Sequence, residues 1–295
     1  MQSTFGKIKP HVGWLALPFA FVFFAYFVLP LVLTIVVSFW DYTDYAIIPD
    51  LILDNYIYIF DGCLSNEGGL CLTLKTYLST FFFCFFTWLI TLVLGFCVAY
   101  FLAFYVNSIP LQVCLFLVCT IPFWTSNVIR MVSWIPLLGR NGLVNEFFLS
   151  LGIIDQPIEW LLYSSFSVIL ALVHLYTLFM IVPIFNSMIR IDRSIVEAAY
   201  DAGASHRQII FNIIIPLSKT GMIIGSIFVV TVVMGDFLTI GIMGGQQLAS
   251  VGKIINTEMN YLQFPGAAAN AVILLIITIF IIYVMTKFVD IRKEL

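Results

Sequence analysis

The chain has few charged residues. Asp, Glu, Lys and Arg make up 10% of its 295 residues, whereas 62% are hydrophobic, and the mean hydropathy is +1.07. Soluble domains are usually about 45–50% apolar, so this composition excludes an ordinary soluble domain and predicts a membrane protein. The net charge of −3 and the lack of a Lys/Arg cluster also argue against nucleic acid as a partner.

The sequence also lacks the motifs of several enzyme classes. It contains no GxxxxGK[ST] phosphate loop, no GxSxG and no HExxH. His11, His174 and His206 are too scattered to predict a metal site or a catalytic base. We therefore expect no catalytic residue, no metal and no cofactor in this chain, so that any ATP would be bound by a separate subunit.

Six apolar runs are long enough to cross the hydrocarbon core, which takes about 20 helical residues. The first follows two lysines and so resembles a signal peptide, but its length and the lack of a small-residue cleavage site predict a membrane helix. Kinks are expected at Pro30, Pro122 and Pro183, which lie inside runs. The predicted fold is one all-α transmembrane domain, 1–295, with helices over 12–40, 77–106, 111–128, 166–189, 220–240 and 267–286.

The distribution of Lys and Arg predicts the orientation of these helices, because positive residues are retained in cytoplasmic loops. With the amino terminus inside, Lys75, Arg130, Arg140 and Lys253 are outside, and nine of the thirteen Lys and Arg residues are cytoplasmic. Both termini and segment 190–218 are then predicted to be cytoplasmic. The nine are Lys7, Lys9, Arg190, Arg193, Arg207, Lys219, Lys287, Arg292 and Lys293.

Segment 190–218 is a polar island between two apolar runs. Ser194 followed three residues later by Glu197 is a capping-box pattern, which predicts a helix over 195–202. Gly203 then favours the left-handed conformation that ends such a helix. Isolated helices shorter than about 12 residues are marginal in water, so we expect a partner to pack against this one.

A second short helix is predicted directly afterwards. Ser205 followed by Gln208 repeats the capping-box pattern. Pro216 is expected to end this helix, because proline has no backbone N–H to donate. The segment is therefore a helix, a sharp turn and a second helix.

The spacing in this segment resembles the EAA motif of ABC importer permeases, with Ile215 where the motif usually has leucine. The resemblance implies that 190–218 is a coupling loop, which docks into a groove on a cytoplasmic ATPase and transmits its motion. Glu197 can also serve as a capping carboxylate. The implied ATPase-coupling residues are Glu197, Ala198, Ala199, Asp201, Gly203, Ile213 and Pro216.

Three outer stretches resemble the permeases of spermidine/putrescine importers, within a resemblance that covers nearly the whole chain from about residue 12. They are NVIRMVSW (127–134), the following segment to 160, in which 143–151 reads as a short surface helix, and GGQQLASVGKIINTEMNYLQFPGAAANAV (244–272). Permeases for opines, ferric iron and sulfate share parts of these stretches, so the solute stays open between a polyamine and these alternatives.

The resemblance also implies a fold and a set of partners. The fold is that of type I ABC importer permeases, in a bacterial inner membrane and surrounded by lipid. The partners are two cytoplasmic ATPase subunits, a periplasmic solute-binding protein and a second permease, in a heterodimer or a homodimer. An ion-coupled secondary transporter is the alternative, but it predicts inverted repeats and mid-membrane charge pairs, which the sequence does not display.

A polyamine pathway would need carboxylates for ammonium groups and aromatic faces for cation–π contacts. Asp236 is the leading candidate because a carboxylate in hydrocarbon is unfavourable; at 1.5 Å per residue from Thr220 it lies roughly 24 Å above the inner face. It either lines the pathway or lies at the membrane interface. Packing or interfacial anchoring is the alternative for the further candidates Trp88, Trp134, Tyr176, Glu258 and Tyr261.

The first outer loop contains two cysteines, Cys63 and Cys71. An oxidising outer compartment would allow them to pair, and we treat this disulfide as a hypothesis. The loop is also acidic, which either attracts a cation or reflects the retention of positive residues inside. Its acids are Asp41, Asp44, Asp50, Asp54, Asp61 and Glu67.

Overall fold

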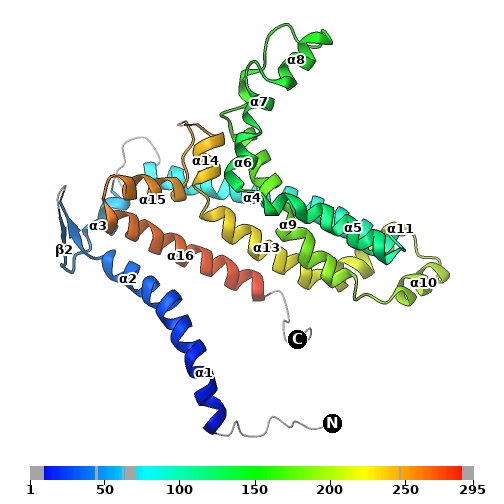
Figure 1. Ribbon diagram of the computed structural model, residues 1–295, viewed down its shortest axis with the longest axis horizontal. Coiled ribbons are helices and arrows are strands. Elements are labelled where there is room, and N and C mark those ends of the chain that lie inside the picture. Colours follow the sequence, from blue (N-terminus) through cyan, green and yellow to red (C-terminus); the bar gives the residue numbers. More distant parts are fainter. Residues whose placement is uncertain (1–9, 44–45, 62, 64–70, 246, 288–295) are drawn as a thin grey trace.

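The computed structural model describes residues 10–43, 46–61, 63, 71–245 and 247–287, with the backbone alone over 10–16. The described residues form a bundle of helices with one short hairpin (Figure 1), so the predicted all-α class is confirmed for them. Some residues used in the sequence predictions lie outside the described part: Lys7, Lys9, Asp44, Glu67, Arg292 and Lys293.

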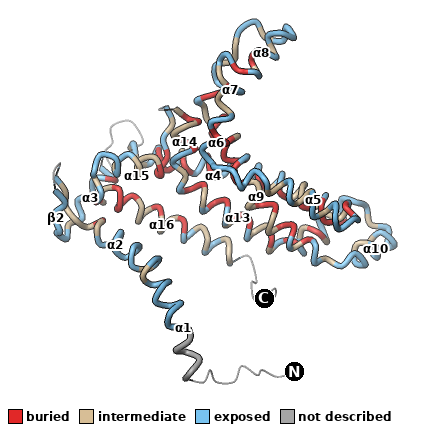
Figure 2. Tube along the Cα trace, viewed as in Figure 1, coloured by how far each residue is buried: buried red, intermediate tan, exposed pale blue. Residues whose placement is uncertain are grey.

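The first membrane helix is continuous but contains a widened turn. It consists of α1 (Pro10–Phe23), the π-helix η1 (Phe24–Val28) and α2 (Leu29–Val37). Pro30 is the second residue after the π-helix; a wider turn accommodates a residue that lacks an N–H. No residue of this helix between Leu17 and Val37 is buried, and it diverges from the bundle (Figure 2).

A small outer cap follows this helix. Strands β1 (Asp41–Tyr42) and β2 (Ile47–Ile48) pair antiparallel, and the short helix α3 (Asp54–Ile59) comes next. The Asn55 Nδ2 donates to the carbonyl oxygens of Ser38 at 3.0 Å and Trp40 at 2.8 Å. The cap is thereby fastened to the end of α2.

Three helices form the core: α4 (Leu72–Tyr100), continued by the π-helix η2 (Phe101–Tyr105), α9 (Ser165–Met188) and α13 (Lys219–Met234). Figure 2 shows the buried residues concentrated along them. A Cβ on Gly95 of α4 would lie 2.7 Å from Met180 Cγ, and one on Gly225 of α13 would lie 2.8 Å from Met180 Sδ. Both helices therefore approach α9 closely because they carry glycine there.

Between α4 and α9 the chain first runs along the bundle as α5 and then leaves it in an arm that carries α7 and α8 (Figure 1). The chain bends by 93° between these two parts, Ile109–Trp124 and Asn127–Ser150. The run predicted as one helix over 111–128 is therefore broken, because a 3₁₀ turn containing Pro122 ends it at Trp124. The elements are α5 (Ile109–Thr120), η3 (Ile121–Trp124), α6 (Asn127–Val132), α7 (Ile135–Leu138), α8 (Leu143–Ser150) and η4 (Glu159–Leu161).

The remaining elements lie at the two ends of the bundle. At one end are α10 (Arg193–Asp201), α11 (His206–Ile209), the π-helix η5 (Ile210–Ile214) and α12 (Ile215–Leu217). At the other end, α13 stops at Met234, short of the predicted 240, and Gly235 separates it from α14 (Leu238–Met243). The amphipathic helix α15 (Val251–Asn260) then leads into the last membrane helix, α16 (Phe264–Lys287).

By length and composition, four of the described helices can cross a membrane, or six if each of two bent pairs is one span. The second bent pair is His206–Leu217 with Lys219–Met234, at 66°. The structure therefore agrees with four to six spans; the predicted count of six depends on how the bent pairs are counted.

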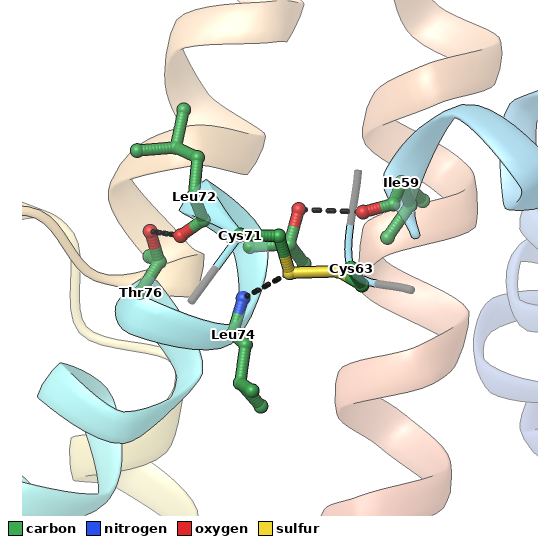
Figure 3. Close-up of a disulfide and its surroundings, with 7 residues drawn as sticks. Ile59, Cys63, Cys71, Leu72, Leu74 and Thr76 are labelled. Carbon is green, nitrogen blue, oxygen red and sulfur yellow. Dashed lines mark hydrogen bonds between the residues drawn. A yellow bond between two sulfur atoms is a disulfide. The ribbon is translucent and has the colours of Figure 1, made fainter. Parts of the chain in front are cut away.

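Cys63 and Cys71 are joined in a disulfide, with their Cα atoms 4.7 Å apart (Figure 3). The Cys71 Sγ also accepts from the backbone N–H of Leu74, at the start of α4. Beside it, the Thr73 Oγ1 donates to the Ile59 carbonyl oxygen at 2.6 Å. The bond thus links the end of α3 to the beginning of a core helix.

We expect peptide mapping of non-reduced protein to find Cys63 linked to Cys71. Cys63→Ala should lower the unfolding free energy by about 2–3 kcal/mol, the loop-closure entropy of a loop of this size, measured by thermal melting in detergent. Cys114→Ala, which removes an exposed free thiol, is the control. Two free thiols in the native protein would contradict the bond.

The close approach of α13 to α9 predicts a packing defect in Gly221→Val. A Cβ there would clash with the Pro183 carbonyl oxygen, and forced overpacking usually costs about 1–3 kcal/mol. We expect a lower melting temperature for this variant. Gly241→Ala, whose Cβ would meet nothing within 4 Å, should melt like the wild type; equal melting of both variants would refute the packing argument.

Candidate functional site

The first helix of segment 190–218 is α10. It begins at Arg193, because the Asp192 carboxylate caps it by accepting from the Ser194 N–H at 3.0 Å. The predicted cap at Ser194 was therefore wrong by two residues. The hydrogen bonds from Ser194 hold the pKa of the Asp192 carboxyl below its usual value, so this cap is charged at neutral pH.

The turn after α10 is a Schellman motif. Gly203 has φ of +81°, as predicted for a left-handed residue. Its N–H donates to the Tyr200 carbonyl oxygen at 2.9 Å, and the Ala204 N–H donates to that of Ala199 at 3.0 Å. The carbonyl groups of Ala199 and Tyr200 in the last turn are thus satisfied, and the helix ends at this turn.

The second helix starts as predicted but ends differently. Ser205 and Gln208 form the reciprocal capping box: the Ser205 N–H donates to Gln208 Oε1 at 2.8 Å, and the Gln208 N–H donates to Ser205 Oγ at 3.4 Å. Pro216 does not end the helix. The π-helix η5 precedes it, and the helical chain runs through the proline to Leu217, because the wide turn absorbs the missing donor.

The coupling residues inferred from the EAA motif divide into two groups by exposure. Glu197, Ala198, Asp201, Gly203 and Pro216 are exposed, whereas Ala199 and Ile213 are half-buried against the core. The α10 helix lies at the end of the bundle opposite α3 and α15 (Figure 1). The carboxylates of this loop are therefore available to a partner, and its apolar residues hold it to the bundle.

The structure brings two of the predicted pathway residues together. The Tyr176 hydroxyl of α9 donates to Asp236 Oδ2 at 2.5 Å. The Thr239 Oγ1 donates to the same oxygen at 2.7 Å, and the Thr239 N–H donates to Oδ1 at 2.8 Å. Asp236 therefore caps the start of α14 and ties it to α9, an arrangement that its position in the sequence did not reveal.

A second polar group lies on the neighbouring helices. The Trp134 Nε1 donates to His174 Nδ1 at 3.0 Å, with the two rings edge to face. Arg130, which the charge count assigned to an outer loop, is 8% exposed and donates to Asn127 Oδ1. Its Nε has no partner among the described residues. The only sequence signal for this buried cation is its position inside NVIRMVSW.

The other candidates make no hydrogen bond to Asp236 among the described residues. The Trp88 Nε1 donates to Ser226 Oγ at 2.8 Å, which joins α4 to α13. The Asn270 Nδ2 donates to both oxygens of Glu258 at 3.1 Å, and burial raises the pKa of the Glu258 carboxyl. Tyr261 is 74% exposed. Trp88 and Glu258 thus hold helices together, and their part in a pathway stays a prediction.

The described part of the chain contains no group of three His, Cys, Asp or Glu side chains that could hold a metal ion. The ion pair between Arg140 and Glu159, at 3.5 Å, is solvent-exposed on both sides and contributes little. Neither a metal site nor this ion pair therefore accounts for how the described helices are held together.

The sequence of the chain is similar to those of known permeases. No family model matches it. It is 34% identical over 269 residues to the spermidine/putrescine transport system permease protein PotB of Escherichia coli K12, covering 90% of each chain. It is 33% identical over 185 residues to PotB of Haemophilus influenzae, which covers 61% of this chain and 64% of that one.

A solved structure has the same fold. A chain of a bacterial alginate ABC transporter, crystallised with an alginate-bound periplasmic protein, superposes with a TM-score of 0.74 at 14% identity, covering 94% of this chain and 92% of the other. At this identity the match bears on the fold alone. The 34% identity over 90% of the chain shows that it belongs to the family of spermidine/putrescine transport system permeases.

Proposed function

We propose that this chain moves a polyamine such as spermidine or putrescine across a bacterial inner membrane, as one permease of an ATP-driven importer with the type I fold. The similarity over 90% of the chain to a spermidine/putrescine permease carries the proposal. The exposed acids of α10 support it, because they offer a docking surface at one end of the bundle.

The mechanism is alternating access. A periplasmic binding protein delivers the solute to the outer end, where α3, α14 and α15 lie. Two cytoplasmic ATPases close on ATP, one against segment 190–218 of this chain and the other against the matching loop of a second permease, in a heterodimer or homodimer. The Lys and Arg distribution supports the cytoplasmic location of both termini and of this segment.

The proposal is tested by reconstituting the chain with its ATPases, second permease and binding protein in liposomes. We expect spermidine or putrescine to stimulate ATP hydrolysis and to accumulate inside, whereas an opine, ferric iron and sulfate do neither. Stimulation by one of these three solutes in place of the polyamines would overturn the solute assignment. Hydrolysis that no tested solute stimulates would overturn the importer itself.

Gly203→Pro tests the coupling step in the same system. Proline fixes φ near −65°, which conflicts with the +81° observed, so we expect basal hydrolysis without solute accumulation. Gly152, at φ +66° after α8, provides the matched control. Gly152→Pro introduces a similar backbone conflict outside segment 190–218 and should retain more transport than Gly203→Pro.

We also propose that Asp236 attracts the ammonium groups of the solute. Asp236→Asn removes the charge and should lower transport by about ten-fold or more, equivalent to about 1.4 kcal/mol of lost attraction. Tyr176→Phe removes a hydrogen bond from the same carboxylate but leaves its charge, so its transport should fall much less. Equal losses of transport and melting temperature in both variants would show that Asp236 is only a cap.

A further inference from the structure

The α10 helix is tied to the bundle near its first residue by Arg193. The Nη1 of Arg193 donates to Asn107 Oδ1 at 2.8 Å, and its Nη2 donates to the Ala103 carbonyl oxygen at 3.4 Å. Ala103 belongs to η2, and Asn107 lies two residues after the end of η2 at Tyr105. The amino-terminal end of α10 is thus bonded to the end of the α4–η2 helix.

The other end of α10 is tied to the same helix through a histidine. His206 Nδ1 lies 2.9 Å from the Tyr200 hydroxyl of α10, and His206 Nε2 lies 3.4 Å from the Tyr100 hydroxyl of α4. In a neutral imidazole one ring nitrogen donates and the other accepts, so one tautomer satisfies both tyrosines. The His206 ring also meets the Tyr100 ring edge to face, with centroids 6.1 Å apart.

Between these two attachments only part of α10 packs on the bundle: Val196 and Ala199 are half-buried against the core. A cavity of about 290 Å³ lies there, lined in part by Phe104, Tyr105 and Glu197. No residue of α10 is buried. The hydrogen bonds at the two ends of α10 therefore add to limited side-chain packing in passing a displacement of α10 to the α4–η2 helix.

The helix that receives both attachments is itself one of the three core helices. It packs along α9 and α13, with Gly95 against Met180. Its end at η2 is a π-helix, a form that often occurs at functional positions in helices. Motion of α10 thus has a direct mechanical route to the three core helices.

We infer that Arg193 and His206 are positioning residues that clamp both ends of α10 to the α4–η2 helix, so that movement of an ATPase docked on α10 reaches the membrane core. This inference rests on the proposed function. We call these two attachments, Arg193 with Asn107 and Ala103, and Tyr200–His206–Tyr100, the α10 clamp.

The clamp is tested in the complete reconstituted importer with Arg193→Gln, His206→Phe and the double variant. Each single change removes two hydrogen bonds and should lower the amount of solute moved per ATP hydrolysed by at least about five-fold, the effect of losing one ordinary hydrogen bond. The double variant should lose most of the stimulation of ATP hydrolysis by solute. The ATPases should still co-elute with every variant, because the exposed docking residues of α10 are unchanged.

Three further variants separate positioning from general damage. Arg193→Lys keeps a donor and should restore part of the coupling lost in Arg193→Gln. Lys219→Gln and Tyr283→Phe remove a charge and a tyrosine hydroxyl at exposed positions elsewhere. Both should keep the wild-type amount of solute moved per ATP hydrolysed. The clamp would be overturned if the double variant moved as much solute per ATP hydrolysed as the wild type, or if the ATPases no longer co-eluted with it.

A second measurement needs no transport activity, and so distinguishes failure of the clamp from failure of the proposed function. Amide hydrogen exchange over 193–204 in the purified full-length chain should be about five-fold faster in each single variant than in the wild type. Exchange unchanged in the double variant would overturn the clamp even if the importer works as proposed. Faster exchange would support it even if the solute proves to be different.

Discussion

The close contact of α4 and α13 with α9 is the constraint on which the bundle depends. Met180 of α9 is fully buried, and glycines stand opposite it on both neighbours, Gly95 and Gly225. Lipid provides no hydrophobic drive between helices, so association relies on van der Waals packing at short distance. Because the contact is this tight, the three helices can transmit a displacement as one body.

Several polar side chains inside the bundle form hydrogen bonds with one another. Tyr176 and Thr239 satisfy Asp236, while Ser226 accepts from Trp88. Each pair joins two different elements across the bundle or closes a helix start. In a medium without water an unpaired polar group is costly, so these side chains also fix the order in which the helices pack. Three buried side-chain atoms have no partner among the described residues: the Tyr77 hydroxyl and Thr87 Oγ1 of α4, and Arg130 Nε.

The end of the bundle that carries α10 is stabilised differently from the core. Its helices are short and exposed, and they are held by caps: Asp192 before α10, the Schellman turn at Gly203 and the Ser205 capping box. Such local hydrogen bonds keep the loop rigid without burying it. Rigidity matters here because a flexible loop would absorb the motion of a partner instead of passing it to the core.

The sequence by itself determined the membrane class, the approximate helix positions, the left-handed Gly203 and the capping box at Ser205, because composition, hydrophobic run length and capping chemistry are local properties. Two predictions from the sequence were wrong. Asp192, not Ser194, caps α10, and Pro216 does not end the second helix, because the π-helix η5 precedes it. Only the tertiary structure decided that Tyr176 meets Asp236 and that Arg193 and His206 reach the same helix. These partners lie 60 or more residues apart, and their meeting depends on how the helices pack rather than on any local pattern.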